Sequence, residues 1–407
     1  MISLNTNGSN SEKQTLMVFP LDMAAHYLRC LELCKKLNAQ FEISFAYSPK
    51  YDRFVKKCGF ETFEVANFNS GEITAAASSF DFSWLNLPTI ESILESQIAA
   101  IEEHGPSLVL GDAAFTLKMA AEKTGVPYVS LLNGYMTKYC RVTRKVSPTH
   151  PGYPYSKTIP KRVFERLTRV IEHAMFEKVH APFRKARKKL NLSKLHYLLE
   201  ELEGDFNLIC DLPGFFPQRK LPENYEFVGP LFYMGDEEEK EVLDFFENNH
   251  LHIMVSTGST GNWKNLNLLL DPVFSDSRIV ISGNASSTIH ASNILSTAFL
   301  NHTNIMVKVD ILICHGGNGT AYQALSHGIP LLFFSGNFEQ EWNIQRIIEM
   351  GLGARLEESF DAAKVREVVD AWIRKRKSAP FLQVQQEIQS FIDKPVTLDR
   401  HQTISGS

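Results

Sequence analysis

The stretch Asp310–Phe334, which reads DILICHGGNGTAYQALSHGIPLLFF, decides how this chain of 407 residues is interpreted. Two short apolar runs, 311–314 and 329–334, enclose a glycine-rich turn and a segment of helix-forming residues. This order predicts a buried strand, a turn, a helix and a second buried strand. The glycines of the turn lack Cβ atoms, so its backbone can bend sharply and approach a ligand closely.

The turn HGGNGT, residues 315–320, also offers chemistry for binding phosphate. Unpaired N–H groups at the start of the following helix, together with the helix dipole, attract an anion. Thr320 adds a hydroxyl group, and His315 can donate a hydrogen bond to a phosphate oxygen. The glycines alone are equally consistent with a tight strand-to-helix turn. Their spacing differs from the P-loop and from the dinucleotide fingerprint G-x-G-x-x-G.

Short apolar runs followed by helical patterns recur along the whole chain. They occur at 15–20, 41–48 and 107–112, and again at 252–259 and 278–283. This alternation predicts an α/β fold with parallel sheets, and the length favours two domains with ligands at the carboxyl ends of the strands. We expect a Rossmann-like domain at 1–215, a linker at 216–235, a second Rossmann-like domain at 236–380, and a C-terminal helix and tail at 381–407.

The sequence around the glycine turn closely resembles the donor-binding signature of the UDP-glycosyltransferase superfamily. Residues 315–356 contain H-G-G-x-G-T, G-x-P, an acidic residue followed by Gln, N-x-x-R and G-x-G, in the order and spacing of that family. The resemblance is strongest to the bacterial family 1 branch that glycosylates lipids, macrolides and other natural products. It covers the C-terminal half well and the N-terminal half more loosely.

The resemblance implies the GT-B fold, in which two Rossmann-like domains face a cleft and the last helix crosses back to the first domain. It also implies that the C-terminal domain binds a nucleotide-diphosphate hexose, above all a UDP-sugar. Glu339 and Gln340 are assigned to the sugar hydroxyls, since a carboxylate accepts two such hydrogen bonds; alternatively they only form the first turn of a helix. The other residues assigned to donor binding are Ser259, Asn301, His315, Gly316, Gly317, Asn318, Gly319 and Thr320.

The same resemblance places a catalytic base in the first helix. The segment AHYLRCLELCKKL aligns without gaps, so that His26 takes the place of the catalytic histidine and Arg29 that of a common proline. Transfer to a hydroxyl group needs a base, and a histidine held by a carboxylate suits this role. Asp112 in SLVLGDAAF matches the family's carboxylate, with Asp22 as its rival. Alternatively, Asp112 caps the helix that follows and His26 only packs in the cleft.

We expect neither a metal nor a cofactor. The chain lacks the D-x-D motif with which transferases of another fold hold a divalent ion, and the glycine turn with His315 can neutralise the leaving diphosphate instead. Attack opposite the diphosphate would invert the anomeric centre. The acceptor is expected to be a small hydrophobic molecule or a lipid. Aromatic residues that line its pocket, unless they only form core, are Phe80, Phe82, Trp84, Phe115, Tyr135 and Tyr139.

Positive charge is concentrated in the segment 138–190. The whole chain has a net charge of −4, yet residues 138–189 contain 15 Lys or Arg and 3 Asp or Glu. Apolar residues recur with a helical period across 158–190, which predicts one long amphipathic helix with a basic face. Such a helix favours peripheral contact with a membrane, although an ordinary solvated face is the alternative. No apolar run is long enough to span a membrane.

We therefore expect a cytoplasmic protein that contacts the inner membrane surface. A nucleic-acid partner is not expected, because the chain is acidic and contains no binding motif. The favoured function is metal-independent, inverting transfer of a hexose with His26 as the base and Asp112 as its partner. One alternative is a UDP-sugar epimerase or hydrolase of the same fold. The other is a non-catalytic protein that binds nucleotide-sugars.

Overall fold

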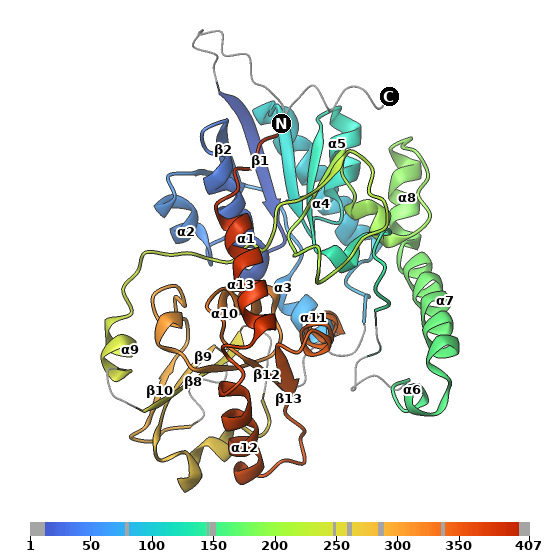
Figure 1. The fold of residues 1–407 in the computed structure, drawn as a ribbon. Coiled ribbons are helices and arrows are strands. Elements are labelled where there is room, and N and C mark those ends of the chain that lie inside the picture. The colour runs from blue at the N-terminus through green and yellow to red at the C-terminus, as the bar shows by residue number, and fades with distance from the viewer. Residues whose placement is uncertain are drawn as a thin grey trace.

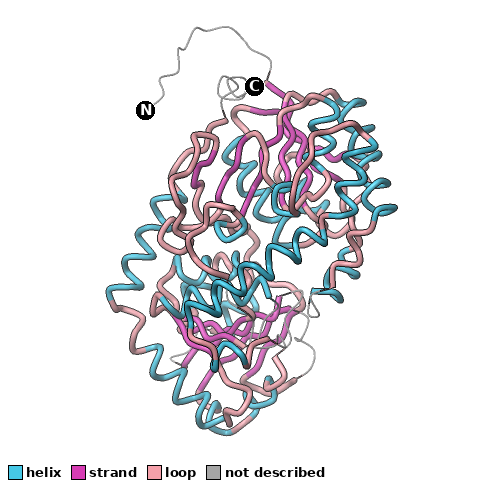
Figure 2. Tube along the Cα trace, turned by 90° about the vertical axis from the view of Figure 1, so that its right-hand side faces the viewer, coloured by secondary structure: helices cyan, strands magenta, loops and turns pink. Residues whose placement is uncertain are grey.

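The computed structural model of this protein describes residues 13–77, 81–144, 146, 152–246, 250–258, 263–283, 289–334 and 338–398. It contains two lobes, each built around one parallel β-sheet with helices packed on its faces (Figures 1 and 2). The α/β class and the two Rossmann-like halves expected from the sequence are confirmed.

The first lobe contains a seven-stranded sheet with the strand order β3-β2-β1-β4-β5-β6-β7. The order changes direction between β1 and β4, which is where open α/β sheets bind ligands. The strands are β1 (Gln14–Pro20), β2 (Phe41–Ala46), β3 (Glu61–Phe63), β4 (Leu108–Asp112), β5 (Tyr128–Leu132), β6 (Phe206–Ile209) and β7 (Tyr225–Phe227). The helices are α1 (Ala24–Leu37), α2 (Asp52–Lys57), α3 (Ser70–Ala77), α4 (Leu87–His104), α5 (Leu117–Thr124), α6 (Tyr155–Thr158), α7 (Lys161–Val179) and α8 (Ala181–Lys189), with the short 3-10 helices η1 (Gly134–Met136) and η2 (Leu198–Leu202).

The second lobe contains a six-stranded sheet with the order β10-β9-β8-β11-β12-β13. Its strands are β8 (Leu251–Gly258), β9 (Ser277–Gly283), β10 (Ile294–Thr297), β11 (Ile311–Cys314), β12 (Leu331–Phe333) and β13 (Gly353–Arg355). Its helices are α9 (Lys240–Phe245), α10 (Asn318–Ser326), α11 (Phe338–Glu349), α12 (Ala362–Ile373) and α13 (Ala379–Ile392), with the short 3-10 helices η3 (Leu266–Leu270), η4 (Pro272–Phe274) and η5 (Met306–Lys308).

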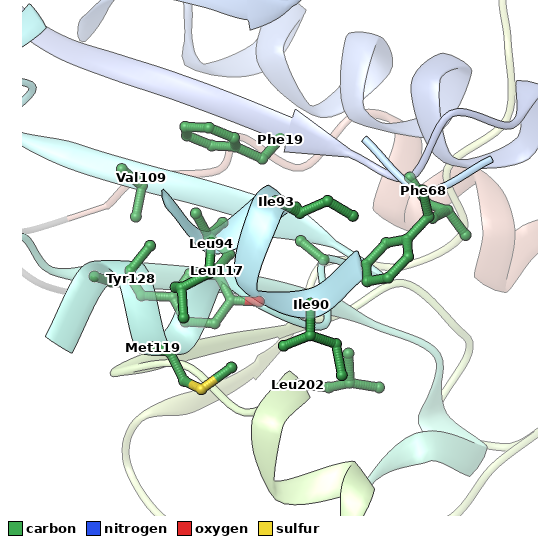
Figure 3. Close-up of a cluster of buried hydrophobic side chains, with 14 of the residues drawn as sticks. Phe19, Phe68, Ile90, Ile93, Leu94, Val109, Leu117, Met119, Tyr128 and Leu202 are labelled. Atoms are coloured by element: carbon green, nitrogen blue, oxygen red, sulfur yellow. The ribbon is translucent and has the colours of Figure 1, made fainter. Parts of the chain in front are cut away.

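The central strands of both sheets are buried on their two faces. Every residue of β4 and of β11 is buried, which explains why these strands are nearly unbroken apolar runs in the sequence. One core of the first lobe packs Phe19 and Val109 of the sheet against Ile93 of α4 and Leu117 of α5 (Figure 3). Burial of each large apolar side chain stabilises the fold by about 1.5–3 kcal/mol, so these cores hold the strand ends in place.

The structure differs from the expected elements in two places. Residues 158–190 do not form one helix, because α7 ends at Val179 and α8 begins at Ala181. Pro182 in the first turn of α8 has no N–H group, and its ring would clash with the carbonyl one turn earlier in a continuing helix. The expected linker 216–235 also contributes a strand, since β7 pairs in parallel with β6 at the edge of the first sheet.

The end of the chain ties the second lobe to the first. Helix α13 packs on α10 and passes between the lobes (Figure 1). The ammonium group of Lys36 in α1 donates hydrogen bonds to the carbonyl oxygens of Phe391 (2.9 Å) and Ile392 (3.0 Å). Gly229 lies against the same helix so closely that a Cβ atom there would be 2.3 Å from the Phe391 side chain. Val396, beyond the helix, is buried in a core of the first lobe.

Candidate active site

His26 and Asp112 lie side by side at the carboxyl edge of the first sheet. Asp112 is the last residue of β4, and His26 lies in the first turn of α1, which follows β1. The two strands are parallel neighbours with Pro20 opposite Asp112, so both side chains reach the same edge. The Nδ1 atom of His26 is 2.8 Å from Oδ1 of Asp112. When Nδ1–H donates this bond, the unprotonated Nε2 is available to a substrate.

The carboxylate that pairs with His26 is Asp112 and not Asp22. Asp112 also does not form a helix cap. Asp22 accepts hydrogen bonds from the hydroxyl of Ser48 (2.6 Å) and the ammonium group of Lys50 (2.7 Å) instead. Asp112 does not cap the next helix, because α5 begins only at Leu117. The residue after Asp112, Ala113, has a positive φ of 51°, a conformation that is uncommon outside glycine and often occurs at functional sites.

Arg29 is a site residue whose role sequence reasoning missed. Its buried guanidinium group binds both carboxylate oxygens of Asp112, through Nε and Nη2. Its Nη1 atom donates to Oδ1 of Asn133 (2.7 Å), and Nη2 lies 3.1 Å from Nδ1 of His26. Burial by itself would raise the pKa of Asp112, but the charges of Arg29 and His26 hold that pKa below its ordinary value. Helical spacing could have identified Arg29 from the sequence, since it lies one turn after His26 on the same face of the helix.

The glycine turn, residues 315–320, faces the His26–Asp112 pair from the second lobe. Gly317 is the N-cap of α10, so the free N–H groups of that helix open toward the cleft. The imidazole of His315 fits beside Gly258 and Gly317, where Cβ atoms would lie 2.5 Å and 2.8 Å from its ring. Burial lowers the pKa of His315, and its Nδ1 lies 3.3 Å from the carbonyl oxygen of Ser256. The ring is therefore neutral at pH 7 before an anion binds beside it.

A cavity of about 240 Å³ joins these two walls. The polar part of its lining contains His26, Arg29 and Asp112 from the first lobe. From the second lobe it contains residues of the glycine turn and of α11, namely His315, Gly317, Asn318, Glu339, Gln340 and Asn343, beside the ring of Trp342. The apolar part belongs to the first lobe and includes Leu21, Met23, Ile73, Phe82, Trp84, Phe115, Met136, Phe176, Leu198, Leu199 and Leu202. One end of the cavity thus suits an anion and the other an apolar molecule.

Comparison with known proteins finds similar glycosyltransferases. A family model described as the C-terminal domain of erythromycin biosynthesis protein CIII-like proteins matches residues 268–389. A PGL/p-HBAD biosynthesis glycosyltransferase of Mycobacterium tuberculosis (strain ATCC 25177 / H37Ra) is 24% identical over 357 residues, covering 85% of this chain and 82% of the relative. A PGL/p-HBAD biosynthesis rhamnosyltransferase of Mycobacterium bovis (strain BCG / Pasteur 1173P2) is 24% identical over 351 residues, covering 84% and 77%. This chain is a glycosyltransferase, and its residues 268–389 match that family model.

Solved structures show the same architecture. The crystal structure of the glycotransferase of kitacinnamycin matches this glycosyltransferase with a TM-score of 0.70 at 17% sequence identity, covering 93% of this chain and 95% of that one. CalG4, the calicheamicin glycosyltransferase, matches with a TM-score of 0.68 at 18% identity. These likenesses establish the GT-B fold that the sequence resemblance implied.

A direct hydrogen bond crosses the cleft of the glycosyltransferase. The hydroxyl of Tyr135, in η1 of the first lobe, donates to Oε1 of Glu339 in α11 at 2.5 Å. Burial, and then the nearby Glu339 carboxylate, hold the pKa of Tyr135 well above its ordinary value, so the phenol keeps its proton and donates. Glu339 is the residue assigned to sugar hydroxyls. Its carboxylate faces the cavity with one oxygen already bound to the first lobe.

Asp211, a second missed residue, joins the two walls through buried hydrogen bonds. Its carboxylate accepts from the N–H of Gly134 (2.6 Å), the hydroxyl of Tyr322 (2.9 Å) and the amide of Asn318 (3.1 Å). The amide of Asn133, which binds Arg29, also lies 3.4 Å from Asp211. Burial raises the pKa of Asp211 to about 6 despite these donors. A continuous polar chain thus runs from His26 to the glycine turn.

Some of the other predicted residues are absent from the described lining of the cavity, among them Gly316, Gly319 and Thr320. Ser259 and Phe80 lie outside the described residues. Asn301 is buried away from the cavity lining, where its amide donates to Oε2 of Glu237 at 2.9 Å, so its contact with the nucleotide base stays a prediction. Tyr139 packs against Tyr225 with ring centres 5.2 Å apart, and it does not line the cavity. Phe82, Trp84, Phe115 and Tyr135 do line it.

The other members of the glycine turn support its shape. Gly316 has a positive φ of 83°, and a Cβ atom there would lie 2.4 Å from the Ile344 side chain. Gly319 and Thr320 form the first turn of α10 with Asn318. In the described ranges, no group of three or more His, Cys, Asp or Glu side chains is arranged to hold a metal ion.

Proposed function

We propose that this protein is an inverting glycosyltransferase that moves a hexose from a nucleotide-diphosphate sugar to a hydroxyl group of a small hydrophobic or lipid acceptor. One observation supports this more than any other: the His26–Asp112 pair and the N-terminus of α10 open onto one cavity with an apolar end. We favour a UDP-sugar as the donor. The rhamnosyltransferase among the relatives makes a deoxyhexose donor a reasonable variant of the same proposal.

The proposed reaction uses a base on one wall of the cavity and an anion site on the opposite wall. Nε2 of His26 takes the proton of the acceptor hydroxyl, whose oxygen forms a bond to the anomeric carbon. The bond from that carbon to the diphosphate oxygen breaks, and the electron pair leaves with the diphosphate. Asp112 stabilises the imidazolium that forms on His26. Because attack and departure occur on opposite faces, the anomeric configuration inverts.

The leaving diphosphate is proposed to bind at the glycine turn without a metal ion. The N–H groups at the start of α10 and the helix dipole stabilise negative charge there. A diphosphate beside His315 would favour a proton on Nε2, which the ring can then donate to a phosphate oxygen. Glu339 and Gln340 are proposed to accept and donate hydrogen bonds with the sugar hydroxyls. The Tyr135 contact of Glu339 would orient its carboxylate for this purpose.

The acceptor is proposed to occupy the apolar end of the cavity. Phe82, Trp84 and Phe115 line this end together with leucines of η2, and such a surface favours an aromatic or aliphatic molecule. A separate acceptor site of this kind favours transfer over epimerisation or hydrolysis, because those reactions need no apolar partner. We also propose that the protein works in the cytoplasm. No helix in the described part of the chain is long and apolar enough to cross a membrane.

Nucleotide diphosphates are expected to stabilise the protein against thermal unfolding. UDP or dTDP at a hundred times its Kd would add about 2.7 kcal/mol to the free energy of unfolding, and His315→Ala should reduce this gain. A thermal-shift panel with UDP, dTDP, GDP and ADP measures it. His327→Ala, at the end of α10 and outside the cavity lining, is the matched control. The donor proposal fails if no nucleotide stabilises the wild type, or if the two variants respond equally.

A further inference from the structure

Helix α7 exposes an apolar surface that the proposed reaction does not use. Only Phe176 of its 19 residues is buried. The exposed fractions of Val163, Leu167, Val170 and Ile171 are 57%, 46%, 62% and 59%. In Figure 1 this helix runs along the outer edge of the first lobe, and in the described part of the chain nothing covers these four side chains.

The four apolar residues form one stripe on the helix. They occupy positions i, i+4, i+7 and i+8, which lie on a single face. We call residues Val163, Leu167, Val170 and Ile171 the α7 stripe. Among the described residues, Leu270, Val307 and Leu382 are similarly exposed, but they lie on three different elements, η3, η5 and α13. Scattered exposed apolar residues are ordinary, whereas a continuous stripe marks an interaction surface.

Basic side chains border the stripe. Arg162, Arg166 and Arg169 precede stripe residues by one position each, so they line one edge of it, and all three are exposed. Of the three acidic residues of the helix, Glu165 and Glu172 are half-buried, and Glu177 lies beyond the stripe toward the carboxyl end. Glu172 accepts a hydrogen bond from Arg144 (2.6 Å). Helix α8 continues the basic surface with four exposed Lys and Arg side chains, Arg184, Lys185, Lys188 and Lys189.

We propose that the α7 stripe and its arginine edge dock on an anionic lipid surface. An apolar stripe bordered by cations lies well in the interface of a membrane, where the apolar side chains enter the acyl boundary and the arginines meet anionic headgroups. A second copy of the chain fits this face less well. In a two-fold dimer each copy would present the same arginines to its partner, and these like charges would face each other.

Helix α7 lies between the stripe and the acceptor cavity. Phe176, near the carboxyl end of α7, lines the apolar end of that cavity, and α7 packs on η2, which contributes Leu198 and Leu202 to the same lining. This part of the inference rests on the proposed function. A protein docked through α7 would hold the apolar part of its cavity behind that helix, close to the lipid phase that supplies a hydrophobic acceptor.

Vesicle binding by the full chain tests this inference. The wild type is expected to co-sediment at low salt with vesicles of phosphatidylcholine and phosphatidylglycerol, to release as salt rises, and to bind pure phosphatidylcholine weakly. Arg162→Gln/Arg166→Gln should weaken binding about 5-fold for each arginine removed. Leu167→Glu/Ile171→Glu should abolish it. Leu382→Glu, a 50% exposed leucine of α13, is the matched control and should bind as the wild type does.

Three results would overturn the inference. The first is no binding of the wild type to anionic vesicles at low salt. The second is an equal loss of binding in the Leu382→Glu control. The third is a wild-type dimer in sedimentation analysis that Leu167→Glu/Ile171→Glu converts to a monomer, because a second copy would then cover the stripe. None of these bears on nucleotide binding, so this inference and the proposed function can fail separately.

Discussion

Replacing His26 with alanine is expected to lower kcat/KM for sugar transfer by about 10²- to 10⁴-fold, the usual contribution of a positioned base. In the proposed reaction the imidazole accepts the hydroxyl proton, and its Nδ1 is held 2.8 Å from Asp112. Stability should change little, because His26 lies at the cavity surface with 13% of its side chain exposed. Steady-state kinetics with the best donor and acceptor measures the effect.

The control for this variant is its binding of nucleotide diphosphate. His26→Ala should bind UDP or dTDP as tightly as the wild type does, because the glycine turn on the other wall is unchanged. His327→Ala should keep full activity. If His26→Ala transfers sugar within a few-fold of the wild-type rate, then His26 is not the base and another group accepts the proton.

The second large effect is expected on folding. Arg29→Met should lower the free energy of unfolding by about 3–5 kcal/mol, since it leaves the fully buried Asp112 carboxylate without its main cation. Because the pKa of Asp112 is lowered in the folded protein, its stabilising contribution is present above its unfolded value of about 3.9 and is lost as the pH falls below it. The difference between variant and wild type should therefore narrow in acid. Urea unfolding at several pH values measures it.

The double variant Arg29→Met/Asp112→Leu separates charge from packing. Replacing both members of a buried ion pair by apolar residues is often neutral, so most of the lost stability should return while sugar transfer stays low. Arg162→Met, on an exposed arginine of α7, should change stability by less than about 0.5 kcal/mol. Equal loss in the single and double variants would show that Arg29 stabilises the fold through packing alone.

The parts of the site that depend on residues adjacent in the sequence could be predicted from the sequence. The strand-to-helix turn at HGGNGT could be predicted from consecutive residues, because glycine conformations and a helix N-terminus are local properties. Asp112 was predictable for a related reason, since a polar residue that ends an apolar strand must lie at the edge of the sheet. The parallel order of the main strands also followed from the alternation of apolar runs and helical patterns.

Contacts between distant segments could not be predicted in the same way. Arg29 and Asp112 are 83 positions apart, and Asp211 and Asn318 are 107 apart, so no local pattern joins them. The short strands β3 and β7 were also not predicted, because three residues are too few to show the alternation of apolar and polar residues that identifies a strand. The break between α7 and α8 could have been predicted from Pro182, which does not fit inside a continuous helix. The prediction of one helix was wrong because the helical period of apolar residues continues on both sides of the proline.

The central claim is most directly tested by the configuration of a product. The purified protein is incubated with each donor of a UDP- and dTDP-sugar panel and with hydrophobic alcohols and phenols, and any glycoside formed is examined by NMR. A base on one wall of the cavity and an anion site on the opposite wall predict transfer with the anomeric configuration opposite to that of the donor. A glycoside that retains the donor's configuration, or release of free sugar with no acceptor glycosylated, would contradict the account.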